Sequence, residues 1–282
     1  MEIIVQPREM QQRSEQNRCQ GIVITFVPTM GYLHEGHLSL MREARKRGDV
    51  LVISIFVNPT QFGPGEDYAQ YPRDMEHDLA LVQDVGVDIC FTPSANEMYP
   101  DGFQTSVEVH HVTENLCGAS RPGHFRGVTT VVAKLFNIVK PHLAFFGQKD
   151  YQQLIAIQRM AEDLNMDIKV IGLTTVREAD GLAMSSRNSY LSPAHRTLAP
   201  GLYRSLVKGK ELFARGERNA ATILNAVRGM IEKETAAAID YVKLCDARTI
   251  QDIDTVTGDA VIAVAARLGT TRLIDNIILR EE

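Results

Sequence analysis

The sequence lacks several features that mark common protein classes. It has no tryptophan and only four cysteines, and no two cysteines form a C-x-x-C pair. This spacing argues against a structural zinc site or a redox dithiol, and isolated cysteines are typical of a reducing compartment. Lys and Arg total 30 against 35 Asp and Glu, giving a net charge of −5. The sequence therefore has no excess of basic residues of the kind found in proteins that bind duplex nucleic acid.

Long apolar runs are also missing. The longest strongly apolar stretch, residues 50–57, is far shorter than the roughly 20 residues that a membrane-spanning helix needs. The first residues, MEIIVQPREMQQRSEQ, are too polar for a secretory signal. We therefore expect a soluble, cytoplasmic protein with no membrane and no nucleic-acid partner. Its 282 residues are enough for one large domain or two smaller ones.

The order of apolar segments indicates the fold class. In the first half, short runs rich in β-branched residues alternate with amphipathic stretches, which predicts a doubly wound, Rossmann-like parallel sheet. After residue 176 two helical stretches are followed by three β-rich runs, which indicates a smaller α+β unit. We therefore predict an α/β domain over 1–176 and a C-terminal α+β lid domain over 177–282. The expected strands are 21–27, 50–57, 87–92, 143–146, 168–176, 238–245, 260–266 and 272–279.

The common nucleotide-binding motifs are absent. No G-x-G-x-x-G follows the first expected strand, which argues against a dinucleotide-dependent dehydrogenase. Gly31 and Gly36 have the spacing of a phosphate loop, but His37 and Leu38 replace its Lys and its hydroxyl residue. Because the Lys and the hydroxyl would hold phosphate and magnesium, a standard phosphate-loop enzyme is not expected.

The segment His34-Glu35-Gly36-His37 stands in that place instead, at the expected start of a helix. Helix N-termini offer main-chain N–H groups and a partial positive charge to a phosphate. Two imidazoles there could stabilise the charge that develops on a phosphate during reaction. Two alternatives remain open for these residues alone: ordinary surface histidines, or half of a zinc site whose third ligand is not close in the sequence.

Two further clusters offer cationic or hydroxyl groups to phosphate. Lys149 follows an expected strand and precedes a helix, where parallel sheets bind their ligands. Ser185, Ser186 and Arg187 lie in a polar segment. Each cluster is weak evidence alone, because lysines at helix starts and Ser-Ser-Arg loops are common on protein surfaces.

Six segments together resemble the pantoate–β-alanine ligase family, within the nucleotidylyltransferases related to class I aminoacyl-tRNA synthetases. The resemblance covers essentially the whole chain, and the segments occur in the family's order. They are PTMGYLHEGHLSLM, FVNPTQF, YPRD, SRPGHFRGV, FFGQKDYQQ and VREADGLAMSSRN.

The resemblance implies an ATP-dependent ligase with a pantoyl-adenylate intermediate, whose nucleotide- and pantoate-binding domain is residues 1–176. It assigns catalytic roles to His34, His37 and Lys149, with His37 usually given the role of proton donor. It implies magnesium with ATP as co-substrate, and a homodimer with SRPGHFRG near the subunit contact. The implied ATP-binding residues are Met30, Gly31, Tyr32, Leu33, His34, Glu35, Gly36, His37, Gly147, Gln148, Lys149, Asp150, Val176, Met184, Ser185, Ser186 and Arg187.

Gln61 and Gln153 match the family's pantoate-binding glutamines, and Gln61 is also expected to contact β-alanine. For magnesium no protein ligand is predicted; Asp78 is the one candidate, against the simpler interpretation of an exposed helix carboxylate. The chain departs from the superfamily's Lys-Met-Ser-Lys-Ser signature, since Ala183 and Ser186 replace its lysines and Arg187 could restore one charge. Two alternative functions remain open: another H-x-G-H nucleotidylyltransferase, and a nucleotide sensor without catalysis.

Overall fold

The computed structural model describes residues 1–281, and its contacts divide the chain into two compact units. The first unit contains Met1–Val109, Arg121–Gln148 and Gln153–Thr174. The second contains Thr175–Glu282 within the described residues, together with two short segments from the first half of the sequence, His110–Ser120 and Lys149–Gln152. The domain boundary after residue 176 stays a prediction.

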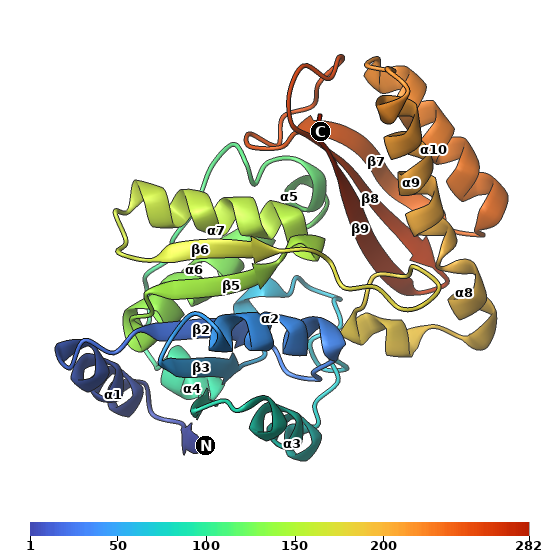
Figure 1. Ribbon diagram of the computed structural model, residues 1–282. Helices are drawn as coiled ribbons and strands as arrows, with labels where there is room; N and C mark the ends of the chain where they lie inside the picture. Colours follow the sequence, from blue (N-terminus) through green and yellow to red (C-terminus); the bar gives the residue numbers. More distant parts are fainter. Residues whose placement is uncertain (282) are drawn as a thin grey trace. The chain divides into compact units, whose positions relative to one another are not determined.

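The first unit is built on a six-stranded, fully parallel sheet in the order β1-β4-β3-β2-β5-β6. Figure 1 labels four neighbouring strands of it, β3, β2, β5 and β6. Its near-continuous apolar strands are covered on both faces, as parallel sheets require. The expected doubly wound architecture is confirmed. The strands are β1 (Glu2–Ile4), β2 (Ile24–Thr29), β3 (Val50–Ile55), β4 (Ile89–Phe91), β5 (Leu143–Gly147) and β6 (Lys169–Leu173).

Helices surround this sheet. Helix α2 packs on β2, β3 and β5 and also contacts α3, and the apolar side chains of this layer form one buried cluster around Met41 and Phe145. Helices α1 and α6 pack on each other and on β2. The helices are α1 (Pro7–Cys19), α2 (Glu35–Arg45), η1 (Pro59–Gln61), α3 (Met75–Val85), α4 (Ala95–Met98), α6 (His124–Val139), η2 (Gln148–Asp150) and α7 (Tyr151–Asp163), and the last two include residues of the second unit.

The second unit is a three-stranded antiparallel sheet packed with two long helices (Figure 1). Strands β7 (Ala238–Asp246), β8 (Ala260–Leu268) and β9 (Thr271–Leu279) follow one another in the sheet. Apolar residues of α9 (Gly201–Ala214) and α10 (Ala220–Glu234) share one core with them. Shorter helices are α5 (Leu116–Ser120), η3 (Ser186–Tyr190) and α8 (Pro193–Leu198). The expected α+β organisation is confirmed.

Two differences from the sequence expectations have simple causes. Strand β1 and helix α1 were not predicted, because α1 exposes a largely polar surface and buries only Met10 and Ser14. Helix α2 begins at Glu35 rather than near His37, because the side chain of His34 caps the helix before its first apolar residue. Within residues 1–281, no helix is long and apolar enough to cross a membrane.

Candidate active site

The turn between β2 and α2 is held in a single conformation by buried contacts. Thr29 Oγ1 donates to the carbonyl of Ser54 at 2.7 Å and accepts the N–H of Gly31 at 3.2 Å. Gly31 has φ +80°, and a Cβ there would lie 2.8 Å from Asp78 Oδ2 and 2.9 Å from Ile55 Cγ2. Only glycine fits this position, because it alone tolerates both the left-handed conformation and the close approach.

Asp78 anchors this turn from helix α3. Its side chain is 1% exposed, and its two oxygens accept the main-chain N–H groups of Tyr32 and Leu33, each at 2.7 Å. Burial raises the pKa of Asp78, while the two N–H donors oppose that rise. The interpretation as an exposed helix carboxylate is therefore wrong. Because both oxygens face the main chain, the candidate magnesium ligand is a structural anchor of the H-x-G-H segment.

His34 and His37 cap helix α2 with their imidazole rings. His34 Nδ1 accepts the N–H of Gly36 at 3.1 Å, and His37 Nδ1 accepts the N–H of His34 at 3.3 Å. The ring centroids are 4.1 Å apart. A neutral imidazole that accepts at Nδ1 carries its hydrogen on Nε2. The capping arrangement therefore makes Nε2 of both rings a donor next to the N-terminus of α2.

Glu35 behaves differently from its two histidine neighbours. Its exposed carboxylate pairs with Arg42 on the same helix, and this hydrogen bond lowers the pKa of Glu35. The carboxylate is thus engaged along the helix. At the helix start, the main-chain N–H of Glu35, and not its side chain, is the group that can bind an anion.

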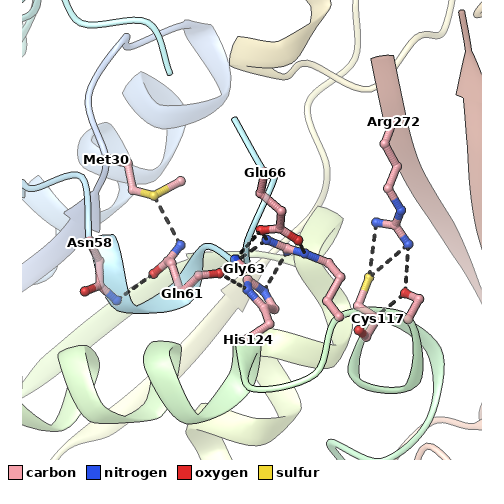
Figure 2. A network of polar contacts seen from close by, with 10 residues as sticks. Met30, Asn58, Gln61, Gly63, Glu66, Cys117, His124 and Arg272 are labelled. Carbon is pink, nitrogen blue, oxygen red and sulfur yellow. Dashed lines mark hydrogen bonds and ion pairs between the residues drawn. The ribbon is translucent and has the colours of Figure 1, made fainter. Parts of the chain in front are cut away.

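The amide of Gln61 is oriented by a chain of contacts that starts at the main chain (Figure 2). Asn58 is 1% exposed; its Oδ1 accepts the N–H of Thr60 at 3.3 Å, and its Nδ2 donates to the carbonyl of Gly127 at 3.1 Å. The same Nδ2 donates to Gln61 Oε1 at 3.1 Å. Gln61 Nε2 therefore becomes the outward donor, and it contacts Met30 Sδ at 3.2 Å. Gln61 thus offers hydrogen atoms to an acceptor next to the H-x-G-H turn.

Gln153 lies on α7 in the first unit and is partly buried. Its neighbour Gln152, in the second unit, is buried and fully engaged, because its side chain bonds the main chain of Val112, Asn115 and Cys117 at 2.7–3.0 Å. Of the two adjacent glutamines, Gln153 is the one without such a structural role.

In the second unit, the main chain of Lys149 is fixed by strand β9. Asn276 Nδ2 donates to the carbonyl of Lys149 at 2.8 Å. The neighbouring Asp275 accepts two hydrogen bonds from Arg177, at 2.7 and 3.0 Å. The Lys149 ammonium lies 3.8 Å from the carboxylate of Asp150. These contacts fix the position of the Lys149 main chain within this unit.

The Ser-Ser-Arg segment is also ordered by local hydrogen bonds. The N–H of Met184 donates to the carbonyl of Val176 at 3.1 Å, so two predicted ATP-binding residues are direct neighbours. Ser185 Oγ accepts the N–H of Arg187 at 3.3 Å and caps the short helix η3. Ser186 is buried at 8% exposure. Local hydrogen bonds thus hold the backbone of this segment.

The sequence model of the pantoate-beta-alanine ligase family matches residues 2–278. The chain belongs to this family. It is 56% identical over 282 residues to the pantothenate synthetase of Syntrophus aciditrophicus (strain SB), covering 100% of this chain and 99% of the relative.

Solved structures of the ligase family are similar as well. The crystal structure of pantothenate synthetase from Thermus thermophilus matches with a TM-score of 0.94 at 45% identity, covering 100% of both chains. A pantoate-beta-alanine ligase from Francisella tularensis, complexed with beta-gamma ATP and beta-alanine, matches with a TM-score of 0.80 at 33% identity, covering 99% of this chain and 97% of that one.

For this member of the ligase family, the predicted residues fall into two sets. In the first unit, residues 30–37 form the β2–α2 corner, Met30 contacts Gln61, Gly147 ends β5 and Gln148 begins η2. The second unit carries Lys149, Asp150, Val176 and residues 184–187. Among residues 1–281, no group of three His, Cys, Asp or Glu side chains is placed to hold a metal ion.

Sequence reasoning missed Asn58, which positions this ligase's candidate site, and considered Asp78 only as a magnesium ligand or an exposed carboxylate. Asn58 lies inside the quoted FVNPTQF segment, so its place beside Gln61 was a usable signal. Asp78 carries no such signal, because an acidic residue in the first turn of a helix is common on protein surfaces.

Proposed function

We propose that the protein condenses pantoate with β-alanine to pantothenate, using ATP and releasing pyrophosphate and AMP. The observation that carries this proposal is the imidazole cap of α2, in which Nδ1 of both His34 and His37 accepts a main-chain N–H and Nε2 is the donor nitrogen of each ring. Membership of the ligase family supports it, as does the complex of the Francisella relative with beta-gamma ATP and beta-alanine.

In the first half-reaction, a carboxylate oxygen of pantoate attacks the α-phosphorus of ATP. The bond from that phosphorus to the bridging oxygen breaks, and the electron pair leaves with pyrophosphate. Negative charge grows on the phosphate oxygens, and donors that are already in place stabilise it without reorganisation. His34 and His37 provide two such donors through Nε2, and His37 is the proposed proton donor.

The other predicted ATP-binding residues keep the roles that the family resemblance implies. The main chain of residues 30–37 lies against the nucleotide, with Gly36 allowing close approach. Lys149, Ser185, Ser186 and Arg187 hold the phosphates. The paired main chain of Val176 and Met184 contacts the adenine. Gly147, Gln148 and Asp150 line the remainder.

Gln61 and Gln153 hold pantoate through neutral amide groups. The outward Nε2 of Gln61 can donate to a carboxylate or hydroxyl oxygen without neutralising the charge of the nucleophile. An arginine in that place would stabilise the ground-state carboxylate and so waste binding energy. In the second half-reaction the amine of β-alanine attacks the acyl carbon of the adenylate, AMP leaves, and the amine loses a proton. Gln61 also contacts β-alanine.

Magnesium accompanies ATP in this proposal. When bound with ATP, it would supply positive charge to the phosphates. The donor set of the H-x-G-H corner does not supply a protein ligand, because both oxygens of Asp78 already accept main-chain N–H groups. The homodimer, the cytoplasmic location and the C-terminal unit as a lid also stay predictions.

The test is pantoate-dependent exchange of labelled pyrophosphate into ATP, with β-alanine omitted. We expect exchange in the wild-type protein that requires pantoate, and its loss in His37→Ala. Adding β-alanine should then give pantothenate and AMP in equal amounts. ATP binding without any exchange would indicate a nucleotide sensor, and exchange that requires a phosphate-ester acceptor instead of pantoate would indicate another nucleotidylyltransferase.

A further inference from the structure

One of the six sequence segments, SRPGHFRGV, has no part in the proposed reaction. It spans residues 120–128 and runs into the first turn of α6. The side chains of Arg121 and His124 contact the loop that carries Gln61, about 60 residues earlier in the sequence; Figure 2 shows His124 beside Gln61.

Arg121 connects this segment to two points of the Gln61 loop. Its guanidinium donates to both carboxylate oxygens of Glu66, at 2.7 and 2.5 Å, and to the carbonyl of Gln61 at 3.3 Å. The carboxylate of Glu66 in turn accepts the N–H of Gly63 at 3.1 Å. The side chains of Arg121 and Glu66 are only 17% and 26% exposed. The hydrogen bond from Arg121 lowers the pKa of Glu66 to about 2, so the pair is charged at neutral pH.

His124 makes a second connection to the same carbonyl. Its Nδ1 lies 2.8 Å from the carbonyl oxygen of Gln61 and its Nε2 lies 3.0 Å from Arg121 Nη1. Because a carbonyl only accepts and a guanidinium only donates, the ring is neutral with its hydrogen on Nδ1. The imidazole therefore bridges the guanidinium and the main chain of Gln61.

The start of α6 also packs directly on this main chain. A Cβ at Gly127 would lie 2.3 Å from the carbonyl oxygen of Thr60 and 2.7 Å from Cα of Gln61. The carbonyl of Gly127 accepts from Asn58, the residue that orients the Gln61 amide. The loop is thus held by the helix backbone as well as by the side chains of Arg121 and His124.

We propose that Arg121, His124 and Glu66 are positioning residues for pantoate: they fix the main chain of Gln61 so that its amide meets the substrate carboxylate in line with the α-phosphate. This inference rests on the proposed function of Gln61. Three residues with no substrate contact thereby control adenylation through a fourth, and a displacement of about 1 Å at a reacting group can slow a reaction about 100-fold.

The experiment measures pantoate-dependent ATP–pyrophosphate exchange in His124→Ala and Arg121→Ala at varied pantoate and varied ATP. We expect the KM for pantoate to rise about tenfold and kcat to fall, with the KM for ATP within twofold of wild type. His124→Asn should recover part of the loss, since the amide of Asn can donate to the Gln61 carbonyl. If Arg121→Ala does not fold, Arg121→Lys replaces it, because lysine keeps the positive charge but lacks the planar guanidinium that makes the paired hydrogen bonds.

Arg13→Ala is the matched control, because it removes an Arg–Glu ion pair of the same unit that shares no residue with the contacts around Gln61. Equal increases of both KM values, or a lower melting temperature with unchanged pantoate kinetics, would overturn the inference. So would an Asn variant no better than Ala. Absence of pantoate-dependent exchange in the wild-type protein would instead overturn the proposed function, and this inference with it.

Discussion

Replacing Asp78 by Asn tests whether a buried carboxylate holds the catalytic corner in place. Asp78 accepts two main-chain N–H groups, from Tyr32 and Leu33, each at 2.7 Å and out of contact with water. Hydrogen bonds to a charged group contribute roughly 1.5–3 kcal/mol each. Asn keeps one neutral acceptor and turns an NH2 group toward the other N–H.

The expected loss is therefore one charge-assisted bond in full and about half of the second, roughly 3 kcal/mol in the free energy of unfolding. This is a large part of a typical stability of roughly 5–15 kcal/mol, so the variant should still fold. The corner would shift, however, and with it the donors of His34 and His37. We expect the pyrophosphate exchange rate to fall about 100-fold.

Urea unfolding and exchange kinetics measure the two effects separately. Asp84→Asn is the matched control, since Asp84 lies on the same helix and is exposed. It should change neither quantity beyond about 0.5 kcal/mol or about twofold. If Asp78→Asn behaved like Asp84→Asn, the hydrogen bonds to the turn would have no role in shaping the site.

Three further predictions concern the same unit. For Glu66, whose pKa falls from 4.5 to about 2 chiefly through its hydrogen bond from Arg121, the ionised pair adds up to about 3 kcal/mol of stability above pH 4.5. The difference in unfolding free energy between wild type and Glu66→Gln, measured in urea, should therefore shrink as the pH falls from 4.5 toward 2, and a difference that grew with acid would contradict this sign. Gly31→Ala should abolish exchange and lower the free energy of unfolding in urea by about 2 kcal/mol or more. The residue has φ +80°, and the added Cβ would lie 2.8 Å from Asp78 Oδ2. Near-normal activity would refute this close packing. Gln61→Arg should tighten pantoate binding in calorimetry yet slow adenylation in a single turnover, whereas faster adenylation would show that a neutral donor is not needed.

The sequence predicts the framework of this protein well because its signals are local. Buried parallel strands such as β3 appear as continuous β-branched runs, and the H-x-G-H segment has a recognisable position after β2. Helix α1 escaped prediction because its amphipathic pattern is weak, and its place depends on packing against α6, which is distant in the sequence. Local pattern cannot reveal a contact that only the tertiary fold creates.

The same limit explains which parts of the candidate site were missed. Met30 and Gln61 could be singled out because they lie in recognisable segments, but their contact across 31 residues required the structure. Asp78 looked like a surface carboxylate, and only the fold shows that it faces the main chain of the H-x-G-H turn. His124 was set aside with a segment expected near the subunit contact, which stays a prediction, and the structure shows its contact with the Gln61 loop of its own chain.

The charged side chains around Gln61 connect the fold to the proposed mechanism. The guanidinium of Arg121 lies within hydrogen-bond distance of the Gln61 carbonyl, so a cation is close to the proposed pantoate site. The carboxylate of Glu66 accepts two hydrogen bonds from this guanidinium, and His124 Nε2 accepts a third hydrogen bond from it. The positive charge is thus neutralised by a carboxylate before it can pair with a substrate carboxylate. Such pairing would lower the nucleophilicity of pantoate, because it would stabilise the reactant more than the transition state. The fold therefore uses arginine for its geometry, to fix a loop, and leaves contact with the nucleophile to neutral amide hydrogens.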